Sequence, residues 1–138
     1  MIDEAKAREL GLRAMACKGW TWTMPWCSLP DKHGRVWRRN WCPQDSGFGW
    51  TQLRGRRLRE PRDSENCCPD FRDPASLGCL LALVLEAHPG CRITLGHEVE
   101  SMRGQGSVCY EGVDGRWHRT KPGLSLVEAL VAALEQAP

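Results

Sequence analysis

The stretch DPASLGCLLALVLEA, residues 73–87, predicts the helix around which the rest of the fold packs. Asp73 is a residue type that caps helix N-termini, and Pro74 suits the first helical position, where no backbone N–H is needed. The leucines and valine that follow cover most sides of the helix, which is typical of a helix buried in a core. Pro89 and Gly90 then predict its end, because proline interrupts a helix and glycine accepts the left-handed conformation.

The residues after this helix predict a small sheet and a closing helix. Three runs have strand-like composition, namely residues 91–99, 107–111 and 116–119. Val113-Asp-Gly has the composition of a tight turn between the last two runs. Ser125 and Glu128 have the spacing of a capping box at the start of a helix with an apolar stripe. We therefore expect α-β-β-β-α over residues 73–138, with the helices packed on an antiparallel sheet.

The residues before Asp73 are of two kinds. Residues 3–17 predict an N-terminal helix, which Gly11 is expected to end early or kink. The segment 18–72 is irregular and holds six of the seven tryptophans. Within it, short strands are expected at residues 20–24, 35–41 and 47–53, followed by a polar connection at 54–70. The whole predicts a single α+β domain over residues 1–138, with 18–72 as an insertion-like, Trp/Cys/Arg-rich segment and 73–138 as the core.

Composition narrows the class of protein. A chain of 138 residues that is 41% hydrophobic and 26% charged has the size and core of one ordinary domain. The most apolar stretch, residues 75–85, is too short to span a bilayer, so no membrane partner is expected. The first twenty residues show no secretory signal, which favours a reducing cytoplasm, where cysteines are thiols or metal ligands.

The charge is unevenly distributed along the chain. Residues 32–62 hold nine Lys or Arg and two acids, which leaves +7 there and −5 elsewhere. Arginine pairs with phosphate and carboxylate, and tryptophan stacks on bases or anchors protein interfaces. The expected partner-binding residues are Arg54, Arg56, Arg57, Arg59, Arg62, Trp37, Trp41 and Trp50. The alternative is that these tryptophans form the core of an irregular half-domain and the arginines a solvated loop.

Metal binding and catalysis are the other two candidate chemistries. Zinc ligands could come from Cys27, His33, Cys42, Cys67 and Cys68, but the chain has no Cys-x-x-Cys pair, so no metal site is assigned. None of the motifs typical of nucleophilic, phosphate-binding, zinc-protease or dinucleotide-binding sites occurs. We therefore expect that the chain is not an enzyme and binds no cofactor. Zinc binding by these five residues is left open.

Three segments resemble a known group of proteins: ARELGLRAMACKGW at 7–20, PDFRDPASLGCLLALVLEA at 69–87 and SLVEALVAALEQA at 125–137. They are similar to short uncharacterised phage and prophage proteins, nearest to the phage alpha-beta-alpha sandwich domain group. The resemblance implies a virus-encoded accessory protein acting in a bacterial cytoplasm, and it brings no catalytic residues. Small phage accessory proteins often bind and block a host machine, including CRISPR effectors.

These observations together predict a non-catalytic binding protein. The expected function is inhibition or modulation of a host protein or nucleoprotein complex, as an anti-CRISPR-like, anti-defence protein. The alternatives are a small nucleic-acid-binding protein that uses the basic segment 32–62, and a virion structural protein. Salt and nuclease separate the first two, because binding to phosphates weakens steeply with ionic strength. The partner's identity and the oligomeric state stay open.

Overall fold

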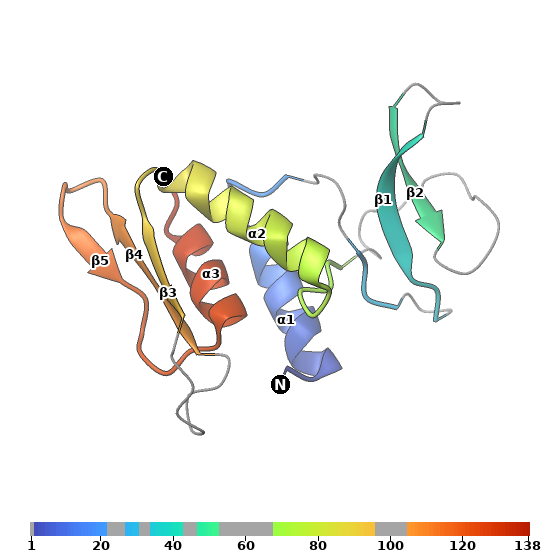
Figure 1. Ribbon diagram of the computed structural model, residues 1–138, viewed down its shortest axis with the longest axis horizontal. Helices are drawn as coiled ribbons and strands as arrows, with labels where there is room; N and C mark the ends of the chain where they lie inside the picture. The colour runs from blue at the N-terminus through green and yellow to red at the C-terminus, as the bar shows by residue number, and fades with distance from the viewer. Residues whose placement is uncertain (1, 22–26, 31–33, 43–46, 53–67, 96–104) are drawn as a thin grey trace. The chain divides into compact units, whose positions relative to one another are not determined.

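The computed structural model describes residues 2–21, 27–30, 34–42, 47–52, 68–95 and 105–138 (Figure 1). Its elements in chain order are α1 (Glu4–Met15), β1 (Trp37–Cys42), β2 (Gly47–Gln52), α2 (Pro74–Ala87), β3 (Arg92–Leu95), β4 (Gly106–Glu111), β5 (Trp117–Arg119) and α3 (Leu126–Glu135). Helices and antiparallel strands are mixed, which confirms the α+β class. The order α2-β3-β4-β5-α3 confirms the expected α-β-β-β-α.

The chain divides into two compact units. One contains Arg13–Trp20 and Leu80–Pro138, and the other contains Ile2–Leu12 and Thr21–Cys79. Both boundaries fall inside helices, so α1 and α2 each contribute residues to both units. The prediction of a single domain, with an insertion-like segment 18–72 and a core 73–138, stays a prediction.

The C-terminal unit is built on the antiparallel sheet β3-β4-β5, with β4 in the centre. Helix α3 lies directly against this sheet (Figure 1). Val108 and Tyr110 of β4 are buried on the side of α3, whose own buried residues are Val127, Ala129, Leu130, Val131, Ala133 and Leu134. On α2 the buried residues of this unit are Leu80, Leu83 and Val84. Burial of these side chains is the main source of stability of the unit.

Local sequence features determine where α3 begins, how closely β4 approaches it and where the β4–β5 hairpin turns. Ser125 Oγ accepts a hydrogen bond from the backbone N–H of Glu128 (3.2 Å), and a Glu128 carboxylate oxygen accepts from the N–H of Ser125 (2.9 Å). This is the capping box expected from the sequence. Gly106 lets β4 approach α3, because a Cβ there would lie 3.0 Å from the Cα of Leu126. Gly115 turns the β4–β5 hairpin with a φ of 71°, as the Val113-Asp-Gly pattern predicts.

In the N-terminal unit, α1 begins at an Asp3 side chain that accepts from the backbone N–H of Lys6 (2.8 Å). The helix runs through Gly11 to Met15, so the expectation that Gly11 ends it early is wrong, and the expected kink stays a prediction. The reason for the glycine is tertiary: a Cβ at this position would collide with Cys68 Sγ and lie 2.9 Å from the backbone oxygen of Pro69. Near the place where Gly11 approaches residues 68–69, a small buried cluster is formed by Ala7, Leu29 and Cys68.

The same unit holds the hairpin β1-β2, whose register pairs Trp37 with Gln52 and Cys42 with Gly47. The strands expected at 35–41 and 47–53 are therefore confirmed to within two residues. Of the strand expected at 20–24, residues 20 and 21 are described and belong to no strand, and residues 22–24 lie outside the described part of the chain. Most of the connection expected at 54–70 also lies outside it. The short extended segment at 27–29 connects two parts of this unit through its backbone. Cys27 forms an isolated antiparallel β-bridge with Arg38, and Ser28 forms another with Pro69.

Asp73 caps the N-terminus of α2, as expected, and also forms an ion pair with Arg38 of β1. One carboxylate oxygen accepts from the backbone N–H (2.9 Å) and hydroxyl (3.0 Å) of Ser76, and the other accepts from Arg38 Nη2 (3.0 Å). Burial raises the pKa of the Asp73 carboxyl, but the hydrogen bonds from Ser76 and Arg38 outweigh burial, so the pKa lies below its ordinary value. The ionised carboxylate therefore stabilises this unit.

Replacing Asp73 by asparagine tests that contribution through its pH dependence. Because the folded-state pKa is lowered, the contribution is complete above the ordinary value of about 3.9 and is lost as pH falls through the folded value. Asp73→Asn keeps a capping oxygen but removes the charge, so we expect it to destabilise the protein by about 1 kcal/mol at pH 7 and much less at pH 2.5. Urea unfolding at the two pH values measures this, and an equal loss at both would contradict the role of the charge.

Candidate functional site

The binding surface expected from the sequence is only partly described. Its five arginines, Arg54, Arg56, Arg57, Arg59 and Arg62, all lie outside the described residues. Trp41 and Trp50 lie on β1 and β2, where the register pairs Trp41 with Phe48 and Trp50 with Arg39. Their part in binding therefore stays a prediction.

Trp37 is a core residue. Only 3% of it is exposed, its backbone N–H donates to Ser28 Oγ (2.9 Å), and its carbonyl accepts from the N–H of Ser28 (2.8 Å). The Arg35 guanidinium carbon lies 5.4 Å from the centroid of its ring. The prediction of an exposed anchor at Trp37 is therefore wrong. The alternative holds for this residue, which is part of the core of the irregular segment. At this end β1 lies between β2 on one side and residues 27–28 on the other, which places Trp37 inside the unit.

A different surface has the properties expected of a binding site, and it lies on the C-terminal sheet. Side chains alternate between the two faces of a strand, so the residues out of phase with buried Val108 and Tyr110 point away from α3. We call this the open face, and its members are Arg92, Thr94, Ser107, Cys109, Glu111, Trp117 and Arg119. Among the described helices, none packs on it (Figure 1).

Trp117 is the large apolar side chain of the open face. It lies on edge strand β5 and is 57% exposed. The guanidinium carbon of Arg92, on the opposite edge strand β3, lies 5.8 Å from the centroid of the Trp117 ring. This contact spans the central strand, where the small side chain of Cys109 leaves room for it. A guanidinium at this distance from an indole is attracted to the ring's electrons, which orients both groups.

Arg119 is the second cation of the open face. Its Nε (3.2 Å) and Nη2 (3.0 Å) both donate to Oγ of the buried Ser107. The register Arg92–Cys109–Arg119 puts the two arginines in one row across the sheet. Their Cα atoms are thus two strand spacings apart, about 10 Å. The bonds to Ser107 hold the guanidinium of Arg119 in place, so this cation is positioned before any partner arrives.

A small hollow adjoins Arg119 on the same side of the sheet. It has a volume of about 120 Å³ and is lined by Thr94, Gln105, Gly106, Ser107, Arg119, Pro122 and Gly123. Along the strands, the open face therefore presents Trp117 and Glu111 in one row, the two arginines in the next, and the hollow at Thr94 and Ser107 in the third. Successive rows are about 7 Å apart.

The surroundings of the open face are basic. Residues 116–121, RWHRTK, place Arg116 and Lys121 on either side of β5. The nearby acid Asp114 is engaged locally, since it accepts from the backbone N–H of Arg116 and from His118 Nε2, and both hydrogen bonds lower the pKa of its carboxyl. The sequence shows the combination of tryptophan and basic residues in 116–121, but this pattern alone predicts only a strand at 116–119.

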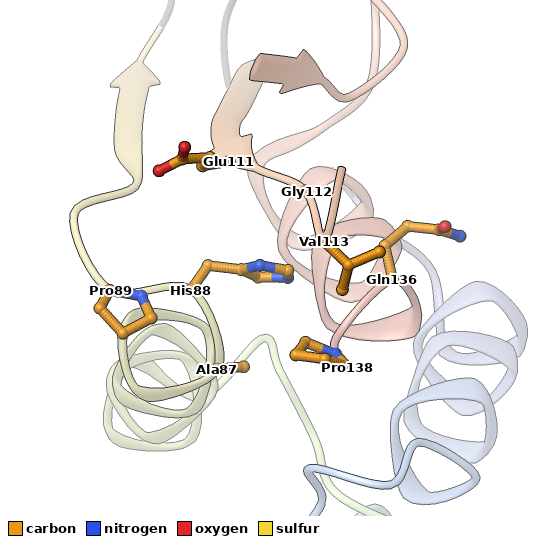
Figure 2. Close-up of a pocket in the computed structure, with 8 residues that line it drawn as sticks. All are labelled: Ala87, His88, Pro89, Glu111, Gly112, Val113, Gln136 and Pro138. Carbon is orange, nitrogen blue, oxygen red and sulfur yellow. The ribbon is translucent and has the colours of Figure 1, made fainter. Parts of the chain in front are cut away.

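A second pocket lies at the C-terminal end of α2 (Figure 2). Its volume is about 270 Å³, and it is lined by Ala87, His88, Pro89, Glu111, Gly112, Val113, Gln136 and Pro138. His88 is 4% exposed, its Nε2 bonds the carbonyl oxygen of Ala133 (2.7 Å), and its ring centroid is 4.4 Å from that of Tyr110. These contacts explain His88 structurally, because they join the end of α2 to α3 and to the sheet.

Of the five zinc candidates, the structure describes the side chains of Cys27 and Cys68. Cys27 Sγ lies against the carbonyl of Ser28, and Cys68 Sγ lies against the carbonyl of Arg8. His33 and Cys67 fall outside the described residues, and only the backbone of Cys42 is placed. No three described His, Cys, Asp or Glu residues gather at a distance suited to one metal ion. Whether zinc binds elsewhere stays open.

The chain matches no protein-family model, no curated protein and no solved structure. The resemblance to the phage group therefore rests on the three sequence segments alone. Among the described helices, none combines the length and the apolar character needed to cross a bilayer.

Proposed function

We propose that this chain is a non-catalytic binding protein that docks the open face of its C-terminal sheet on an anionic partner. One observation carries the proposal: the half-exposed Trp117 lies under the guanidinium of Arg92, in a face that also holds the positioned Arg119. Tryptophan and arginine are the residue types most enriched at the energetic centres of interfaces. Arg116 and Lys121 add positive charge around this centre and would speed its encounter with an anion.

The biological role in this proposal follows the resemblance to phage proteins. A phage-derived chain acting in the bacterial cytoplasm would inhibit or modulate a host protein or nucleoprotein complex by covering a functional surface, as anti-CRISPR-like proteins do. The basic segment 32–62 is proposed to add a second set of contacts to the same partner. The open face supports binding because its side chains are those that recognise anions and flat rings.

A capture experiment with matched variants tests the proposal. Tagged protein is incubated with bacterial lysate, with and without nuclease, and retained proteins and nucleic acids are identified. We expect a discrete partner that is retained by wild type and by Lys18→Glu, and is lost with Arg92→Glu combined with Arg119→Glu. Lys18 is an exposed cation of the same unit, in the turn that follows α1. Equal retention by all three proteins would remove the open face as the binding site, and retention by none would contradict binding.

A further inference from the structure

We propose that the component recognised by the open face is a single-stranded nucleic acid, with one base stacked on Trp117 and the phosphate backbone held by Arg92 and Arg119. This inference rests on the proposed function, since it names the chemistry of the partner at the same site. It uses residues of β3, β4 and β5, rather than the basic segment 32–62 to which the sequence pointed.

The shape of the open face suits an extended polymer. Rows of side chains repeat about every 7 Å along the sheet. The Arg92 guanidinium lies against the Trp117 ring of the first row, and the Arg119 guanidinium donates to Ser107 of the third row, beside a hollow of about 120 Å³. A strand with one charge per nucleotide can lie along this line, with a phosphate near each guanidinium.

The composition of the open face favours a nucleic acid over an acidic protein. Centres of protein interfaces hold arginine as well, but they are built around several apolar side chains. Here Trp117 is the single large apolar side chain among the seven members. A tryptophan flanked by cations is the arrangement with which proteins bind single strands without strong sequence preference, because each base has a ring face and each nucleotide a phosphate.

The arrangement of Trp117 further favours a single strand over a duplex. Bases in a duplex are stacked on one another and offer no free ring face, so a tryptophan gains little from contact with its exterior. In the structure the Trp117 ring is partly covered by Arg92 but 57% of the residue stays exposed. An unpaired base can therefore stack on the indole or on the guanidinium that lies over it.

Direct binding of defined oligonucleotides tests the inference. The probes are fluorescein-labelled single strands of about 12 nucleotides, oligo-dT and a mixed-sequence RNA, together with a duplex of the same length, and binding is followed by fluorescence anisotropy. We expect the full chain to bind both single strands more tightly than the duplex. Two phosphate contacts alone should give a slope of about −1.4 in a plot of log affinity against log salt.

The variants separate stacking from charge. Trp117→Ala should weaken single-strand binding about 5- to 100-fold at constant salt, and Trp117→Phe should recover part of it, since phenylalanine also stacks. Arg92→Gln and Arg119→Gln should each reduce the salt slope by about 0.7. Glu111→Gln should tighten binding about 2- to 5-fold, because Glu111 is the carboxylate of the open face and repels phosphates. Val113→Ala, at a residue 92% exposed in the turn of the same hairpin, is the matched control and should change nothing.

Two results would overturn the inference. If no single strand binds, or if Trp117→Ala binds single strands as wild type does, the open face is not a single-strand site. If oligonucleotides fail to bind while a nuclease-resistant protein is captured in a manner that depends on Arg92 and Arg119, the partner is a protein, and the proposed function survives without this inference. Equal melting temperatures for wild type and each variant ensure that a loss of binding is not a loss of folding.

Discussion

Leu130→Ala is expected to lower the free energy of unfolding by about 2–5 kcal/mol, a large share of the 5–15 kcal/mol typical of a domain. Leu130 lies in α3, and none of its surface is exposed. Its neighbours in the same helix, Ala129 and Val131, are also fully buried, so the environment of this side chain is packed on all sides. Removing three carbons there leaves a cavity between α3 and its surroundings that the fold closes only in part.

Leu85→Ala is the matched control for this change. Leu85 is also a leucine in the interior of a helix, α2, but about half of it is exposed to solvent. The same truncation should therefore cost less than about 1 kcal/mol. Urea unfolding followed by circular dichroism gives both values. Similar losses for the two variants would contradict the assignment of α3 as the helix that carries the core of the C-terminal unit.

Gly11→Ala is expected to destabilise the protein by about 1–3 kcal/mol, although alanine is the better helix former. A Cβ at residue 11 would collide with Cys68 Sγ and approach the backbone oxygen of Pro69. Pro69 is buried and bridges to Ser28, so its backbone cannot withdraw without disturbing the extended segment that joins this unit. The steric cost should therefore exceed the gain in helix propensity.

Gly78→Ala is the matched control, because Gly78 is a helical glycine with no atom within 4 Å of the position where a Cβ would lie. There the substitution should stabilise the protein by about 0.5–1 kcal/mol through the lower entropy of the unfolded chain. Opposite signs for the two glycines, measured as shifts in the urea midpoint, are the expected result. A stabilising Gly11→Ala would show that α1 does not approach residues 68–69 as closely as the structure has it.

The elements that the sequence predicts well are those with local causes. The N-cap at Asp73, the capping box from Ser125 to Glu128 and the turn at Gly115 each depend on residues within four positions of one another. All the interactions that form these features lie within a few residues, so composition and spacing are enough to predict them. The helices α2 and α3 and the β4–β5 hairpin followed from these signals.

The features that the sequence did not predict depend on residues far apart in the chain. Gly11 looks like a helix breaker, and its role is visible only when Pro69 is brought beside it. Trp37 looks like an exposed anchor, but it is buried, and its backbone pairs with Ser28, nine positions away in the sequence. The open face has the same origin, because Arg92 and Trp117 meet only when β3 and β5 flank β4. The order in which the three strands pair, and not the secondary-structure propensity of their residues, creates the open face.

Binding of a single strand to the open face is tested most directly by an NMR titration of the ¹⁵N-labelled full chain with unlabelled oligo-dT. We expect the amide signals of β3, β4 and β5 to move together, and one tryptophan indole signal, assigned by its absence in Trp117→Phe, to move with them. Signals of α1 should stay in place. Shifts confined to other residues, such as the basic segment 54–62, with the Trp117 indole unmoved, would contradict binding of the strand at the open face.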